Sequence, residues 1–276
     1  MRKEIIFAAL ICSASWLSAG DVSMTRIYPE NMLKNADFSV RDADGMPQDW
    51  EFDNCSKAKF SFRSDIGGIV IESPGQAYGY FLQTVPVQEG VTYHTGTKMR
   101  VYRTFANMWL RCAEYHDNKS AQGHWPPSQT DFFIQAYPYH GKSTEALLKK
   151  FIDPKLVAGV DNKEWTEYCR EFTTITGKGV RNYQVRVGCF GGYKGWVNYT
   201  DVYFAPAAST LEITVCRADW KELSVVGKSG KKYFEKLNDG KCGNHFSVIL
   251  PSRLVGYFLH LKTSDGQTRT VEVPNE

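Results

Sequence analysis

The chain has 276 residues, with 33 Lys and Arg against 30 Asp and Glu, which gives a formal net charge of +3. Such a balanced charge creates no strong field, so the composition argues against a nucleic-acid partner or an anionic lipid surface. Aromatic residues make up 14% of the sequence, which favours β-structure. The length allows one large domain and a smaller second one.

The first twenty residues have the composition of a secretory signal peptide. A basic start precedes an apolar stretch from Ile5 to Cys12, and Ser18-Ala-Gly20 offers small residues for cleavage before Asp21. The apolar stretch is shorter than the ~20 residues of a membrane-spanning helix, and no later segment is long and apolar enough to span. We therefore expect residues 1–20 to be removed from an exported protein, either secreted or held at the cell surface (bacterial periplasm or exterior).

Period-two alternation dominates the following part of the chain, and helical periodicity is scarce. Strands are predicted at 57–62, 68–72, 97–102 and 106–115. Turn residues separate them at short intervals, as in a β-sandwich. Residues 143–152 differ, because a Ser start and apolar residues at helical spacing predict a short helix. This helix lies in an insertion of about 122–163, which is longer than ordinary loops and therefore a candidate functional segment.

The segment Ala205–Ser209 reads as a linker, because Pro206 stands among small residues. Beyond it the β-pattern repeats on a smaller scale, so we place a first domain at 21–206 and a second at 207–276. Cys216 and Cys242 both fall in the second domain. A disulfide between them would close a loop of about 26 residues and contribute ~3 kcal/mol in an exported protein.

Two segments about 150 residues apart read as the first and last strands of one sandwich. They are Asn31–Phe38, followed by Asp44–Pro47 and Asp49-Trp50, and Tyr183–Phe190, followed by Gly195-Trp196 and Tyr199–Phe204. They resemble the opening and closing of galactose-binding-like jelly rolls, the fold of many carbohydrate-binding modules: Asn-Leu-x-x-Asn-x-x-Phe, Gly-x-Pro-x-x-Trp, and a strand ending in Asp-Asp-Val. Segments 81–93, 108–117 and 164–174 resemble the strands between. The resemblance covers roughly residues 28–206 and implies ligand binding on a rigid sheet, without catalysis.

In this resemblance, one face of the central strand carries the ligand. Trp109, Arg111 and Tyr115 alternate with more apolar positions that should face the core. Aromatic rings stack on sugar rings while polar side chains bind hydroxyl groups. The candidate ligand-binding residues are Trp109, Arg111, Tyr115, Gln184 and Arg186 on the strands, and Trp125, Tyr137 and Tyr139 in the insertion. The alternative is that the insertion covers Trp109 and Tyr115, which then serve packing.

The resemblance also implies a structural calcium ion near the paired first and last strands. Asp201 matches the second Asp of the Asp-Asp-Val ending, and Asp37 could supply a second carboxylate. Thr200 and Ser39 stand where the pattern has acidic residues. Calcium at Asp37 and Asp201 is therefore an expectation, and no organic cofactor is expected. The sequence has no Gly-x-Ser-x-Gly, His-Glu-x-x-His or P-loop motif, so we do not expect an enzyme.

Leu223–Val226 with Gly230-Lys231, and Leu254–Lys262 with Asp265-Gly266, resemble a small immunoglobulin-like module. Similar endings occur in sorting domains of bacterial surface proteins, although the Asn-Pro opening and basic terminus are missing here. A plain accessory β-domain is the alternative. The expected fold is thus all-β: a jelly-roll β-sandwich with a long helix-containing insertion, followed by a small immunoglobulin-like β-sandwich.

Two functions follow from these patterns. The first is an exported, non-catalytic carbohydrate-binding protein that holds a polysaccharide or glycoconjugate on an aromatic face of the sandwich. The alternative is a structural or adhesion protein of the cell envelope that binds a protein partner.

Overall fold

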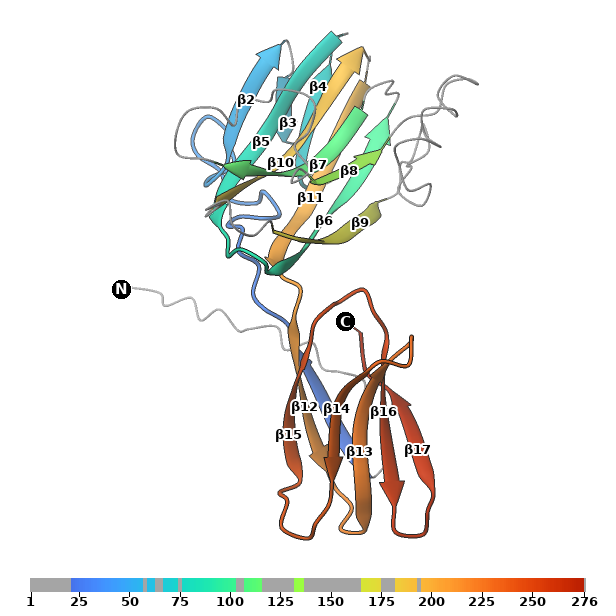
Figure 1. Cartoon of the computed structure of the whole chain (residues 1–276). Coiled ribbons are helices and arrows are strands. Elements are labelled where there is room, and N and C mark those ends of the chain that lie inside the picture. Colours follow the sequence, from blue (N-terminus) through green and yellow to red (C-terminus); the bar gives the residue numbers. More distant parts are fainter. Residues whose placement is uncertain are drawn as a thin grey trace, which may run out of the picture. The chain divides into compact units, whose positions relative to one another are not determined.

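The computed structural model describes residues 21–56, 59–62, 67–73, 76–102, 107–115, 132–136, 165–174, 182–192 and 195–275. The secondary structure of these residues consists of seventeen β-strands in four sheets. The described residues divide into two compact units, one within 30–207 and one made of 21–29 with 208–275 (Figure 1). No helix among the described residues has the length and apolar character needed to cross a membrane. The predicted helix at 143–152 lies outside these residues.

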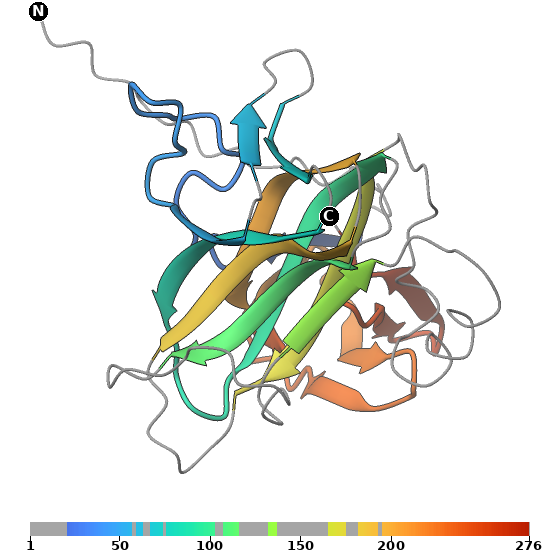
Figure 2. The ribbon, with the colours of Figure 1, turned by 90° about the horizontal axis from the view of Figure 1, so that it is seen from above.

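The larger unit is a sandwich of two five-stranded antiparallel sheets (Figure 1), which Figure 2 shows from above. The first sheet has the order β2 (Glu51–Ser56), β5 (Gln76–Pro86), β10 (Asn182–Gly192), β7 (Asn107–Tyr115) and β8 (Phe132–Ala136). The second has the order β3 (Lys59–Phe62), β4 (Ile69–Ser73), β11 (Gly195–Pro206), β6 (Thr92–Tyr102) and β9 (Thr166–Thr173). The predicted all-β sandwich is confirmed, and the four predicted strands correspond to β3, β4, β6 and β7.

Aromatic rings fill the core between these two sheets. Phe81 of β5 contacts Phe60 of β3 edge-on, with ring centroids 5.2 Å apart, and Phe172 of β9 lies 5.6 Å from Tyr183 of β10. The buried aliphatic residues alternate along the strands, as Val185 and Val187 do on β10. This alternation leaves the intervening positions on the outer sides of the sheets.

We expected the segment Asn31–Phe38 to be the first strand of the sandwich, and this prediction is wrong. The segment is a series of turns and bends. Asn35 and Phe38 have φ values of 47° and 60°, which a strand cannot accommodate. The Asn31 side chain binds β11: its Nδ2 donates to the Val202 carbonyl at 2.8 Å, and its Oδ1 accepts from the Phe204 amide at 3.0 Å. Two backbone hydrogen bonds add to this contact, from the Met32 amide to the Phe204 carbonyl and from the Val202 amide to the Ala36 carbonyl. The segment is therefore fixed to the last strand without being a strand itself.

The smaller unit is a second sandwich, with seven strands in two antiparallel sheets. One sheet has the order β1 (Val22–Ile27), β12 (Ser209–Val215) and β15 (His245–Leu250). The other has the order β14 (Lys232–Leu237), β13 (Trp220–Gly227), β16 (Tyr257–Thr263) and β17 (Thr268–Glu272). Trp220 and Tyr257 are the largest fully buried side chains of its core.

Residues 21–29 belong to this smaller sandwich, although we expected them to open the large domain. In β1, Val22 pairs with Val215 and Ile27 pairs with Thr210. The larger sandwich is therefore inserted, in sequence, between the first two strands of the smaller one. Sequence alone did not reveal this, because a six-residue alternating segment carries no mark of its pairing partner.

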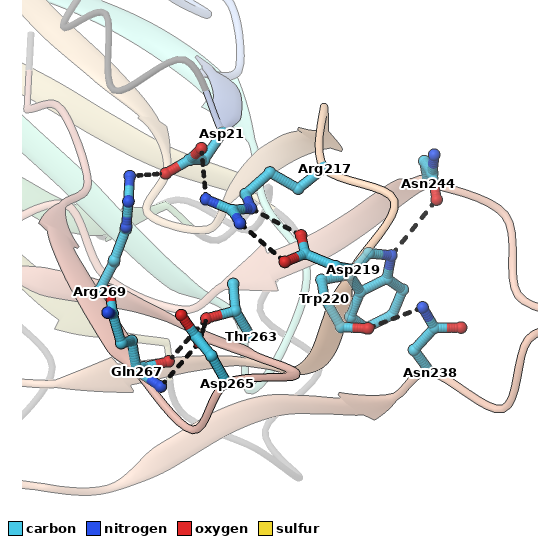
Figure 3. A network of polar contacts seen from close by, with 10 residues as sticks. All are labelled: Asp21, Arg217, Asp219, Trp220, Asn238, Asn244, Thr263, Asp265, Gln267 and Arg269. Carbon is cyan, nitrogen blue, oxygen red and sulfur yellow. Dashed lines mark hydrogen bonds and ion pairs between the residues drawn. The ribbon is translucent and has the colours of Figure 1, made fainter.

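A network of charged side chains fixes the start of β1 (Figure 3). The Asp21 carboxylate accepts hydrogen bonds from Arg217 Nη1 at 3.4 Å and from Arg269, and the Asp21 carbonyl accepts from the Cys216 amide at 2.8 Å. Arg217 also binds Asp219 through two bonds of 2.7 Å. The hydrogen bond from Arg217 lowers the pKa of Asp219, and the same bond raises the pKa of Arg217.

The predicted disulfide between Cys216 and Cys242 is not formed, and both thiols are free. The Cys242 thiol donates to Asp239 Oδ1 at 3.0 Å, and this bond lowers the pKa of Asp239. The thiol of Cys216 lies 3.9 Å from the Thr214 carbonyl oxygen.

Candidate functional site

The register of the first sheet brings several of the predicted ligand-binding positions to one side. On β10, Arg186 lies opposite Arg111 and Gln184 opposite Ala113, while Gly188 lies opposite Trp109 and Asn182 opposite Tyr115. Directly opposite residues of an antiparallel pair share a side of the sheet. The intervening residues of β10 are buried in the core, so the predicted strand positions share the outer side. The predicted residues Trp125, Tyr137 and Tyr139 lie outside the described residues.

Arg186 is the central charged group on this side, and it is only 3% exposed. Its Nε donates to Gln184 Oε1 at 3.0 Å, and its Nη2 donates to the same oxygen. The guanidinium carbon lies 5.0 Å from the centre of the Tyr80 ring, a cation–π distance. The Tyr80 hydroxyl in turn donates to Asp53 Oδ2 at 2.5 Å. Side chains from β2, β5 and β10 thus form one polar chain across the sheet.

Gly188 makes room for this arrangement. It lies directly opposite Tyr80 in the pairing of β10 with β5. A Cβ atom at Gly188 would come within 2.4 Å of the Tyr80 Cβ and 2.6 Å of the Gly79 carbonyl oxygen. The position therefore requires glycine for the two strands to approach with Tyr80 in place.

The centre of this outer side is buried, and its border is exposed. Tyr80 and Leu82 are 6% and 7% exposed, whereas Glu51, Asp53 and Thr84 are exposed and Gln184 is half-buried. Asp53 and Tyr80 were not among our predicted site residues. The alternation of β5 could have indicated Tyr80, because it falls between core positions, but the pairing of β5 with β10 was needed to place it beside Arg186.

The predicted calcium ligands lie at a β-bulge of β11. The register with β6 shifts between Thr200 and Tyr203, and Asp201 has a φ of 51°. The Asp201 Oδ2 atom lies 2.7 Å from Lys98 Nζ. This hydrogen bond raises the pKa of Lys98, so the amine stays charged.

Asp37, the other predicted ligand, uses its Oδ1 atom to accept from the Ser39 amide at 3.1 Å. Within the part of the chain that the structure describes, no three His, Cys, Asp or Glu side chains form a cluster that could hold a metal. The Asp201 carboxylate thus already has a cation beside it, the Lys98 ammonium. These residues fit calcium poorly, and the calcium site stays a prediction to be measured.

No family model matches the chain, and no curated protein matches it. Solved structures do match. TmCBM61, determined in complex with β-1,4-galactotriose, matches with a TM-score of 0.38 and 13% identity, over 64% of this chain and 99% of its own. A CBM4 structure matches with a TM-score of 0.41 and 15% identity, over 63% and 98%. A family 16 carbohydrate-binding module matches with a TM-score of 0.35 and 12% identity, over 63% and 99%.

Proposed function

We propose that this protein is an exported, non-catalytic carbohydrate-binding protein that holds a polysaccharide or glycoconjugate on the outer side of the sheet β2-β5-β10-β7-β8. The observation that carries the proposal is the polar chain of Asp53, Tyr80, Arg186 and Gln184, on the same side of the sheet as positions 109, 111 and 115. The motif resemblance to galactose-binding-like sandwiches supports the same assignment.

The chemistry of these groups suits sugar hydroxyls. A guanidinium donates hydrogen bonds, and carboxylate and amide oxygens accept them. Because buried Arg186 donates two hydrogen bonds to Gln184, the orientation of the half-buried Gln184 amide is set before a ligand arrives, which lowers the entropic cost of binding. The half-buried Gln184 and the exposed Asp53 are the two ends of this polar chain, and both are accessible.

A glycan array probed with the full-length protein tests the proposal. We expect retention on at least one polysaccharide class. Replacing Gln184→Ala should weaken that binding about tenfold, the cost of about one hydrogen bond to a charged or polar group. Trp109→Ala and Tyr115→Ala should weaken it as well, because stacking would be lost.

The control for these variants is Ser247→Ala, an exposed position on β15 of the smaller sandwich, which should bind as the wild type does. An array without any bound glycan would contradict the proposal. Incubating the protein with a retained polysaccharide should leave the polymer length unchanged, and shortening of the polymer would contradict the non-catalytic assignment.

The centre of the outer side of the sheet β2-β5-β10-β7-β8 is buried, and this burial favours a second candidate function. Arg186, Tyr80 and Leu82 are almost inaccessible, which suits a protein whose outer face serves packing and whose partner is another protein of the cell envelope. Recovery of one stable protein partner from surface extracts, together with an empty glycan array, would support this structural or adhesion function instead.

A further inference from the structure

A hollow lies on the outer side of the other sheet of the larger sandwich, β3-β4-β11-β6-β9. It has a volume of about 420 Å³ and is lined by Lys98, Trp165, Glu167, Thr200 and Asp201. Lys98 of β6 lies opposite both Thr200 of β11 and Glu167 of β9, so side chains from three neighbouring strands meet there. The volume falls within the range of small-ligand sites. This hollow is on the opposite side of the sandwich from the polar chain of Arg186.

The β-bulge of β11 is what presents Asp201 to the hollow. Its left-handed backbone, with a φ of 51°, is unusual for a residue other than glycine. Two buried hydroxyl groups of β6 fix the bulge: Thr97 Oγ1 donates to the Thr200 carbonyl at 3.0 Å, and Thr95 Oγ1 donates to the Tyr203 carbonyl at 2.9 Å. Strained conformations that the surroundings hold in this way concentrate at binding sites.

The charged groups of the hollow are accessible and balanced. Lys98 and Asp201 are paired at 2.7 Å, yet the side chain of each is 46% exposed. Glu167 adds a second exposed carboxylate, and Arg100 adds a second cation at the Trp165 ring. Two carboxylates would repel an anionic ligand, and the Lys98 ammonium would repel a cationic one. A purely apolar ligand would remove these charges from water without compensation.

Trp165 supplies an aromatic wall. The guanidinium carbon of Arg100 lies 4.5 Å from its ring centre, a cation–π contact that holds the indole in place. A held ring loses little entropy when a flat apolar surface stacks on it. Sugar rings combine such an apolar surface with hydroxyl groups around the edge.

We propose that this hollow is a second binding site, for a neutral polyhydroxylated ligand of the size of one or two sugar residues. Trp165 stacks on the sugar ring, Asp201 and Glu167 accept hydrogen bonds from its hydroxyl groups, and Lys98 donates to a ring or hydroxyl oxygen. The site does not depend on glycan binding at the first sheet.

Ligand-observed NMR titration of the full-length protein tests this site, with neutral tetrasaccharides of β-glucan, β-galactan, xylan and mannan as probes. The titration is made in the Gln184→Ala background, so that binding at the first sheet is weakened. We expect at least one tetrasaccharide to bind, and Trp165→Ala to weaken it by about tenfold or more. Glu167→Gln should weaken it several-fold, while Glu30→Gln, which makes the same charge change at another exposed carboxylate, should have no effect.

Thermal melting is used to check that each variant is folded. If Trp165→Ala does not fold, the affinity of Glu167→Gln tests the proposal, because Glu167 is exposed and its replacement should leave the fold intact. Equal affinity of Gln184→Ala and of the same protein carrying Trp165→Ala or Glu167→Gln in addition would overturn the proposal, as would the absence of binding by all four tetrasaccharides. A Trp165→Ala single variant that binds as the wild type does, together with loss of binding in Gln184→Ala, would support the first site and overturn the second.

Discussion

The two sandwiches use polar side chains in different ways. In the smaller one, charged groups around the start of β1 pair with each other, as Arg217 does with Asp219 and Asp21, and the network fixes that strand. In the larger one, Arg186 and Lys98 are each held by a neighbour, but they stand on the outer sides of the two sheets. The polar groups of the smaller sandwich thus fix one of its strands, whereas for those of the larger one we propose a role in ligand binding.

Separating β1 from the smaller sandwich should have the largest effect. Val22 and Met24 of β1 pack against its core, and their strand pairs along β12. We expect a fragment of residues 208–276 to be unfolded by circular dichroism, a loss of about 5 kcal/mol, comparable with the whole stability of a domain of this size. A version with residues 21–29 joined through a flexible linker should fold.

A peptide of residues 21–29, added to the fragment, should restore the β-sheet spectrum. Cooperative melting of the fragment without that peptide would show that β1 is dispensable and that the two sandwiches differ less than we infer.

Gly188→Ala should have the next largest effect, because the added methyl group meets the backbone of β5 and the Tyr80 side chain. We expect a loss of about 2 kcal/mol in the free energy of unfolding, typical of overpacking, measured by urea denaturation. Gly243→Ala is the matched control, since nothing lies within 4 Å of the added atom there. Equal stabilities of the two variants would mean that Gly188 does not set the approach of β10 and β5.

Calcium should raise the melting temperature only when Lys98 is removed from the β-bulge. In the wild type the Lys98 ammonium occupies the Asp201 oxygen, so added calcium should change the melting temperature little. In Lys98→Met the carboxylate is released, and we expect millimolar calcium to raise the melting temperature by mass action, equivalent to about 1 kcal/mol. No difference between calcium and chelator in the variant would remove calcium from this site.

Acid should weaken the smaller sandwich through Asp219. Its pKa is lowered by Arg217 in the folded state, so its contribution is present above the unfolded pKa of about 3.9 and is lost as the pH falls through the lower folded value. We expect Asp219→Asn to reduce the drop in melting temperature below about pH 4. An identical acid profile for the variant and wild type would show that this pair contributes nothing measurable.

Reducing agent should have the smallest effect, because Cys216 and Cys242 are free thiols. We expect the same melting temperature with and without dithiothreitol, and two alkylated cysteines by mass spectrometry of that region. A mass difference corresponding to a bridge would restore the disulfide prediction.

Much of the larger sandwich could be predicted from sequence, because alternation and turn residues are local signals. The strands at 59–62 and 107–115 follow this pattern. The segment around Asn31 was misread as a strand because it binds β11 through turns, with the Asn31 side chain and two backbone hydrogen bonds, which no local pattern records. The partner of β1 was missed for the same reason, since pairing over such a distance leaves no periodic trace.

The candidate site was predicted in part. Alternation placed Gln184 and Arg186 on the outer side of the sheet, and the register with β7 brings them beside positions 109 and 111. The hollow at Trp165 could not be foreseen, because it depends on a break in alternation at Asp201 that directs a carboxylate toward two other strands. The resemblance had assigned this aspartate to a metal, whereas the structure pairs it with Lys98.

The insertion of one sandwich between β1 and β12 of the other sets an order of assembly during synthesis. β1 leaves the ribosome early, but its partner at residues 209–215 follows only after the whole of the larger sandwich has been made. Closing so long a loop is slow when the intervening chain is unfolded, and a domain that has already folded brings its two ends together in advance. We therefore expect the larger sandwich to fold first, and β1 to pair with β12 only after that step.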